Sequence, residues 1–156
     1  MAHIPNADFL ICLKNLPIVA VDILLFNNEK NKILLFKRAN EPVKGIYFSP
    51  GGRINKNETI AEAASRKLLE ETGLKIDPNK LIFGGVTEES FDNGIFGKID
   101  THYIDIIYGL ILNNDFQENS IKLDSQHSKY KWHNINDDNL HIYMKNKIKT
   151  IIDKIK

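Results

Sequence analysis

The segment that decides the fold spans residues 52–74 and reads GRINKNETIAEAASRKLLEETGL. We predict a helix from about Thr59 to Thr72, because Thr59 followed three residues later by Glu62 forms a capping box. Gly73 then stands at the position that usually adopts a left-handed conformation and ends a helix. The segment is therefore expected to fold as a loop, a helix and a second loop.

This helix carries clustered charges beside a glycine-rich loop. Each helical residue advances by about 100°, so positions 67 and 71 lie about 40° apart on one face. Arg66 is four residues from both Glu62 and Glu70, which predicts pairing with carboxylates along the helix. Carboxylates such as Glu70 and Glu71 beside this loop suit a hard cation such as Mg²⁺, which takes oxygen ligands. The alternative is surface ion pairing, the commonest fate of helical Glu and Arg.

On both sides of this segment, the sequence predicts further strands and helices. An apolar stripe of Ala61, Ala64 and Leu68 would pack the central helix against a sheet. A short helix over residues 6–14, capped by Asn6, and an amphipathic C-terminal helix containing Met144 are also predicted. Strands are expected at 18–26, 33–38, 46–48, 81–86, 102–112 and 130–132, with residues 49–52 ending the third. This order indicates an α/β fold with a mixed sheet between helices, in one domain spanning residues 1–156.

The composition limits the classes of function. Hydrophobic residues make up 42% of the 156 residues and charged residues 26%, which excludes a disordered tail, a collagen-like fibre and a disulfide scaffold. The net charge of +1 argues against nucleic-acid binding through bulk charge, so phosphate recognition requires a local site. No apolar run is long enough to span a bilayer, the start of the chain lacks a basic signal region, and Cys12 has no partner cysteine. We therefore expect a cytoplasmic protein with no membrane partner.

The arginines give a further indication of phosphate binding. Only three of the 21 basic residues are arginine, namely Arg38, Arg53 and Arg66. A guanidinium binds phosphate through two parallel hydrogen bonds, which lysine does not reproduce. Their grouping in one part of a lysine-rich chain favours a phosphate site, with chance clustering as the alternative.

The spacing of residues 52–74 resembles the Nudix box, the signature of enzymes that hydrolyse nucleoside diphosphates linked to another group. Gly52, Glu58, Arg66 and the run that ends at Gly73 all match it. The resemblance implies the Nudix fold, a mixed β-sheet sandwiched between helices. One position departs, because the box has glutamate directly after the arginine and this chain has Lys67. The lysine removes a ligand and adds positive charge, so we expect a single metal ion and a catalytic base elsewhere.

Most of the chain, from about Pro17 to Trp132, resembles a Nudix subfamily that also lacks this glutamate, the GDP-mannose mannosyl hydrolases. The matching segments are residues 17–22, 37–38, 45–53, 101–103 and 124–132. The resemblance implies hydrolysis of GDP-mannose, or of GDP-glucose, to GDP and free sugar. Water would attack the anomeric carbon with inversion, with Mg²⁺ or its substitute Mn²⁺ as cofactor. The resemblance also implies a homodimer.

The resemblance carries site residues over position by position. The Mg²⁺ ligands would be the Gly51 carbonyl, Glu71 and Gln126. His127 would be the general base, which must lie across the sugar ring from the leaving group in an inverting reaction.

The same resemblance assigns four residues to the substrate. Arg38 and Arg53 would bind the diphosphate and stabilise the leaving GDP, which needs positive charge more than protonation. Asp22 and Tyr103 would contact the substrate, and Asp22 is also a candidate catalytic residue.

Three questions stay open from the sequence. Residues 87–90 contain Glu88 and Glu89 where related sequences have a tryptophan and a histidine beside the sugar, so the preferred hexose is not defined. An ordinary Nudix diphosphatase would instead attack phosphorus by means of Glu70 and Glu71, although Lys67 argues against it. A non-catalytic nucleotide-sugar binding module is the third interpretation, and Lys67 favours it.

Overall fold

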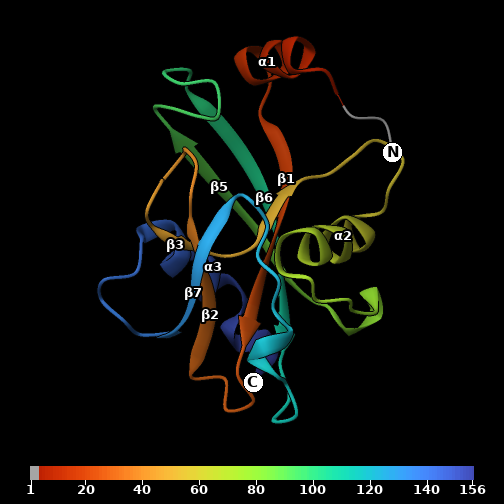
Figure 1. Ribbon diagram of the computed structural model, residues 1–156, viewed down its shortest axis with the longest axis vertical. Coiled ribbons are helices and arrows are strands. Elements are labelled where there is room, and N and C mark those ends of the chain that lie inside the picture. The colour runs from red at the N-terminus through yellow and green to blue at the C-terminus, as the bar shows by residue number, and fades with distance from the viewer. Residues whose placement is uncertain (1–3) are drawn as a thin grey trace.

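The computed structural model describes residues 4–156 as a central sheet between helices (Figure 1). The elements, in chain order, are α1 (Asn6–Asn15), β1 (Ile18–Phe26), β2 (Lys32–Arg38), β3 (Tyr47–Phe48), β4 (Gly51–Arg53), α2 (Ile60–Thr72), the 3₁₀ turn η1 (Pro78–Lys80), β5 (Ile82–Phe91), β6 (Thr101–Ile111), the 3₁₀ turn η2 (Glu118–Ser120), β7 (His127–Asn134) and α3 (Ile142–Ile155). None of the helices in this described part is long and apolar enough to cross a bilayer.

The sheet is mixed, as the sequence predicts. Its strand order is β3-β2-β1-β6-β5, with β4 paired to β1 and β7 paired to β2. Strands β1 and β6 run parallel, with Ala20 opposite Asp105 and Asp22 opposite Ile107, while the other named pairs are antiparallel. The central position of β1 explains why it is almost wholly apolar, since both of its faces are covered.

Two apolar cores lie on opposite faces of the sheet. Alternate side chains of β1 point to opposite faces, so Ile23 packs against α2 and Leu24 packs on the side of α3. Figure 1 shows α2 and α3 on either side of the strands. The α/β/α sandwich is therefore confirmed. The predicted stripe on α2 is shifted, because Ala63, Ala64 and Leu68 are buried. Ala61 is only half-buried, since the packed face is turned toward Ala63.

The ends of the central helix are as predicted. Thr59 caps α2, with its hydroxyl accepting a hydrogen bond from the Glu62 amide and the Glu62 carboxylate accepting one from the Thr59 amide. Gly73 ends the helix at a φ of 74°, a left-handed conformation that glycine adopts without a steric penalty.

Several other boundaries differ from the expectation. Asn6 does not cap α1, because it lies inside the helix and Pro5 holds the cap position. The expected turn at 49–52 instead contributes β4, which pairs with β1. Strand β5 runs on to Phe91, because β6 supplies backbone partners as far as Thr101. Strand β7 starts at His127, because β2 supplies partners as far as Arg38.

Candidate active site

A cavity of about 440 Å³ brings together residues from β1, β2, β4, β5, β6, α2 and α3. Seven of the eight residues that the sequence nominates line it: Asp22, Arg38, Gly51, Arg53, Glu71, Tyr103 and Gln126. His127 is the exception and lies behind this lining. Residues that are 104 positions apart, such as Asp22 and Gln126, thus share one concave site, which is the usual form of a small-molecule site.

Glu71 connects α2 to the glycine-rich loop. Its Oε2 accepts a hydrogen bond from the Gly51 amide at 3.0 Å, and its Oε1 lies 2.8 Å from Lys67 Nζ. Burial raises the pKa of Glu71, and the charge of Lys67 opposes this shift. Gly52 has a φ of 151°, a backbone conformation that favours glycine, and a Cβ there would lie 2.7 Å from Lys67 Cε, so a larger residue would also displace the lysine side chain.

Lys67 brings positive charge to the face where a Nudix box has glutamate. Its ammonium lies 3.3 Å from Glu70 Oε2 in addition to its contact with Glu71. Burial alone would lower the pKa of Lys67, but the charges of Glu71 and Glu70 raise it, so the side chain is charged at neutral pH. The predicted placement of positions 67 and 71 on one face of the helix is confirmed, and the structure adds the ion pair between them.

Arg66 joins the helix to the preceding loop. Its guanidinium lies 2.7 Å from Glu58 and 3.2 Å from Glu70, and it donates a hydrogen bond to the Arg53 carbonyl at 3.2 Å. The hydrogen bond from Arg66 lowers the pKa of Glu58. The expected pairing of Arg66 with Glu62 is wrong, because the Glu62 carboxylate is used in the capping box.

Arg38 and Arg53 reach the cavity from different strands. Arg38 ends β2, and its Nε donates to the Pro42 carbonyl at 2.8 Å, which orients the guanidinium. The Arg53 guanidinium lies 4.3 Å from the centre of the Phe9 ring, a cation–π contact that places α1 beside the site. Two guanidinium groups facing one cavity can bind the oxygens of a diphosphate.

Asp124 organises the loop before β7. One of its carboxylate oxygens accepts a hydrogen bond from the Gln126 amide at 3.0 Å, and the other accepts from Gln126 Nε2 at 3.2 Å. Asp124 Oδ1 is also 2.9 Å from His127 Nδ1. The His127 side chain is only 1% exposed, and its Nε2 lies 3.9 Å from Glu71 Oε2 with no hydrogen-bond partner among residues 4–156. The loop thus places Gln126 in the cavity and His127 beside Glu71.

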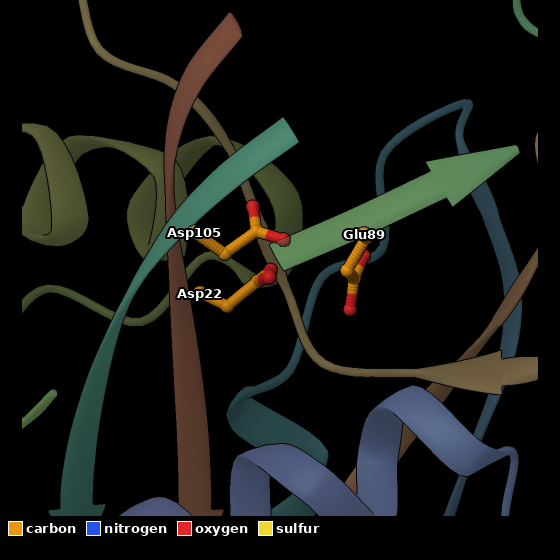
Figure 2. A group of neighbouring side chains, drawn as sticks. All are labelled: Asp22, Glu89 and Asp105. Atoms are coloured by element: carbon orange, nitrogen blue, oxygen red, sulfur yellow. The ribbon is translucent and has the colours of Figure 1, made fainter. Parts of the chain in front are cut away.

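A buried charged group forms another part of the cavity, and Asp22 is the one member of it that the sequence nominated as a site residue. Figure 2 shows the side chains of Asp22, Asp105 and Glu89 extending from β1, β6 and β5, and one oxygen of each lies within 4.8 Å of the others. Lys147 of α3 reaches into the group, with Nζ 2.5 Å from Asp22 Oδ2 and 2.7 Å from Glu89 Oε1. The signal available in the sequence was Lys147 itself, which stands three residues after Met144 on the buried face of α3.

Two oxygen-rich places in the cavity bear on cation binding. The Gly51 carbonyl, Glu71 and Gln126 offer oxygen donors of the kind that Mg²⁺ prefers, so their chemistry fits one hard cation. Such an ion would compete with Lys67 for Glu71 Oε1. The oxygens of Asp22, Glu89 and Asp105 also lie within 4.8 Å of one another, but the Lys147 ammonium already lies among them.

Comparison with known proteins agrees with the fold and the helix motif. The family model described as "NUDIX domain" matches residues 16–154. The "Low-salt glycan biosynthesis protein Agl8" of Haloferax volcanii is 32% identical over 130 residues, which cover 83% of this chain and 78% of that protein. The "ADP-ribose pyrophosphatase" of Methanocaldococcus jannaschii is 50% identical over 58 residues, covering 37% of this chain and 33% of that protein.

Solved structures give the same fold. The NUDIX domain of Shewanella oneidensis NrtR, solved in complex with ADP ribose, superposes with a TM-score of 0.68 at 19% identity. The superposition covers 98% of this chain and all of that one. Since the family match extends from the start of β1 almost to the end of α3, the chain belongs to the Nudix hydrolase family.

Proposed function

We propose that this Nudix hydrolase cleaves nucleoside diphosphate sugars, with GDP-mannose as the principal substrate and GDP-glucose as a second. Water would attack the anomeric carbon with inversion and release GDP and free sugar. The observation that carries the proposal is the Lys67–Glu71 ion pair. It places an ammonium where a second carboxylate would hold a metal cluster for attack on phosphorus. The relative named for glycan biosynthesis also supports a sugar-linked substrate.

The cationic side chains of the cavity would stabilise the leaving group. Arg38 and Arg53 would bind the diphosphate and absorb the negative charge that develops on GDP as the glycosidic bond breaks. Nudix hydrolases use a divalent metal, and a single Mg²⁺ or Mn²⁺, when bound, would add positive charge there. Gly51, Glu71 and Gln126 would hold this ion.

His127 would be the general base. Its contact with Asp124 at Nδ1 directs Nε2 to accept the proton of the attacking water. Because this side chain is only 1% exposed, the base must become reachable when substrate binds. A His127→Gln variant is therefore expected to lose most of its turnover and still bind GDP-mannose. Equal turnover in the variant would remove His127 from this role.

A second candidate function is attack on phosphorus. The pyrophosphatase of Methanocaldococcus jannaschii, 50% identical over part of the chain, favours it. In that reaction Glu70 and Glu71 would serve the metal, and GDP-mannose would yield GMP and mannose 1-phosphate.

One experiment separates these reactions. The protein is incubated with GDP-mannose and Mg²⁺ in ¹⁸O-labelled water, and the products are analysed by mass spectrometry. Attack at carbon places the label in mannose and leaves GDP unlabelled. Label in a phosphate group, with GMP as product, would overturn the proposal. Tight binding of GDP-mannose without turnover would instead indicate a binding module. The same assay with GDP-, UDP- and ADP-linked sugars would define the base and the sugar.

We infer a homodimer in the cytoplasm from the sequence resemblance and composition. Sedimentation equilibrium of the purified chain tests the dimer, since a monomer at micromolar concentration would contradict it.

A further inference from the structure

Lys67 lies where a Nudix box has a carboxylate, and its surroundings indicate more than charge balance. Its side chain is 12% exposed, and its ammonium lies 2.8 Å from Glu71 Oε1 and 3.3 Å from Glu70 Oε2. The stem of Lys67 passes close to Gly52, where a Cβ would lie 2.7 Å from Lys67 Cε. Lys67 therefore lies between α2 and the glycine-rich loop, and it lines the cavity.

Glu71 has a partner within the chain for each of its carboxylate oxygens. Oε1 contacts the Lys67 ammonium, and Oε2 accepts a hydrogen bond from the Gly51 amide at 3.0 Å. The Glu71 side chain is 4% exposed, and a buried carboxylate without a counter-charge is costly. Lys67 is therefore the resident counter-ion of a carboxylate that also belongs to the proposed Mg²⁺ ligands.

A divalent ion and the Lys67 ammonium would compete for Glu71. Two cations at one carboxylate repel each other strongly where little water screens them. The lysine stem is flexible, so the ammonium can leave Glu71. Glu70 is a weak alternative partner, because its side chain is 49% exposed and Arg66 already lies 3.2 Å from it. A displaced ammonium therefore requires another anion.

A bound diphosphate would supply that anion. Arg38 and Arg53 line the same cavity of about 440 Å³ as Lys67, so a diphosphate bound by the two guanidinium groups would share this space with the ammonium. An ammonium on a flexible stem binds phosphate as a compact point charge. Lys67 can therefore exchange a carboxylate partner for a phosphate partner.

We propose that Lys67 makes metal binding depend on the substrate. Before the substrate binds, the ammonium pairs with Glu71 and competes with a divalent ion. When a diphosphate binds, the ammonium moves from Glu71 to a phosphate oxygen, and Glu71 then ligates the ion. This inference rests on the proposed binding of a diphosphate by Arg38 and Arg53. It adds a phosphate-binding role for Lys67 and a coupling between metal and substrate.

The test compares the natural protein with Lys67→Met, which keeps an unbranched apolar stem and removes the charge. Electron paramagnetic resonance of unbound Mn²⁺ measures the affinity for the ion without nucleotide. Mn²⁺ should bind about tenfold more tightly to the variant, because the competing ammonium is gone. Isothermal titration calorimetry at saturating Mn²⁺ measures the affinity for GDP. GDP should bind several-fold more weakly to the variant, because a phosphate partner is lost.

Lys56→Met is the matched control. Lys56 is exposed in the loop before α2, outside the cavity lining, and the substitution removes the same charge. Both affinities should equal those of the natural protein. Opposite shifts for Mn²⁺ and GDP are not expected of a residue with only a structural role, since a disturbed site would bind both more weakly. Unchanged or weaker Mn²⁺ binding by Lys67→Met would overturn the proposal. Tighter Mn²⁺ binding with GDP affinity unchanged would overturn it too, because the ammonium would then not move to a phosphate.

Lys67→Gln replaces Lys67→Met if the methionine variant does not fold. Its amide can donate a hydrogen bond to Glu71 without adding charge, and the same two shifts are expected. Neither measurement involves turnover, so the site of water attack is read separately. Formation of GMP from GDP-mannose together with the expected affinities would refute attack at carbon and leave the role of Lys67 standing. Release of GDP without those affinities would do the reverse.

Discussion

A single side chain, Lys67, sets the charge of the helix side of the cavity. It satisfies Glu71 Oε1 and lies near Glu70, so the protein supplies a cation of its own there. Lys67→Glu would replace that cation by a third carboxylate on the same face. We expect two Mn²⁺ ions in this variant and one in the natural protein, because clustered carboxylates attract hard cations. Isothermal titration calorimetry with Mn²⁺ measures the stoichiometry without reference to activity.

Lys56→Glu is the control for this change. Lys56 is exposed in the loop before α2, outside the cavity lining, and the substitution changes the net charge by the same amount. Its Mn²⁺ stoichiometry should equal that of the natural protein. If Lys67→Glu also leaves the stoichiometry unchanged, Lys67 does not limit the number of ions.

At the residue scale, the sequence predicted contacts that lie close together in the chain. Lys67 and Glu71 are one helical turn apart, so helix geometry alone places them on one face. The contact of Asp22 with Lys147 joins residues 125 positions apart, and no local pattern brings β1 to α3. The sequence could identify Asp22 through its resemblance to a family, but Asp105 and Lys147 belong to no such motif.

At the element scale, the capping box holds the start of α2, the helix that carries Lys67 and Glu71. Thr59→Ala removes the hydroxyl that accepts from the Glu62 amide, and we expect a loss of about 1 kcal/mol in the free energy of unfolding. Urea unfolding followed by circular dichroism measures the loss.

Asn6→Ala is the matched substitution on α1. The sequence suggested Asn6 as a helix cap, but in the structure it lies within the helix, where alanine is the better helix former. This variant should lose no stability. If Asn6→Ala costs as much as Thr59→Ala, then Asn6 caps α1 and its placement inside the helix is wrong.

The types of the elements were predictable, and several of their ends were not. Ile18–Phe26 and the amphipathic α3 are recognisable from apolar periodicity, which depends on local sequence. The last residues of β5, including Glu88 and Glu89, are polar and would be read as a loop. They continue the strand because Ile104 and Tyr103 of β6 lie opposite them, and such pairing depends on the whole sheet.

At the scale of the whole molecule, the four buried residues Asp22, Glu89, Asp105 and Lys147, which we call the Lys147 network, couple the site to the stability of the fold. The α3 side of the sheet is an apolar core around Leu24, Ile107 and Met144, and the network lies two residues beyond Leu24 and Ile107 on the same strands. The same faces of β1 and β6 therefore contribute apolar side chains to the core and, two residues away, charged side chains to the cavity. Stability should depend on the protonation of the network.

The sign of this pH dependence follows from Asp105. Burial raises its pKa from an ordinary value near 3.8 to about 9, and Lys147, Asp22 and Glu89 are the charged groups that face it. The folded chain thus binds a proton that the unfolded chain has released, so the contribution of Asp105 to stability is greatest at low pH and falls as pH rises toward 9. Burial also raises the pKa of Asp22 to about 6, so that residue contributes mainly below pH 6. Between pH 6 and 9 the free energy of unfolding changes with pH chiefly because Asp105 titrates, and this change is at most about 1.4 kcal/mol per pH unit.

Asp105→Asn removes that titration, so its free energy of unfolding should change less between pH 6 and 9 than that of the natural protein. Urea unfolding at pH 6, 7, 8 and 9 measures both slopes. Asp153→Asn is the control, because a hydrogen bond from Lys156 lowers the pKa of Asp153 and keeps its titration below this range. Equal slopes in the natural protein and in Asp105→Asn would mean that Asp105 is ionised in the folded state.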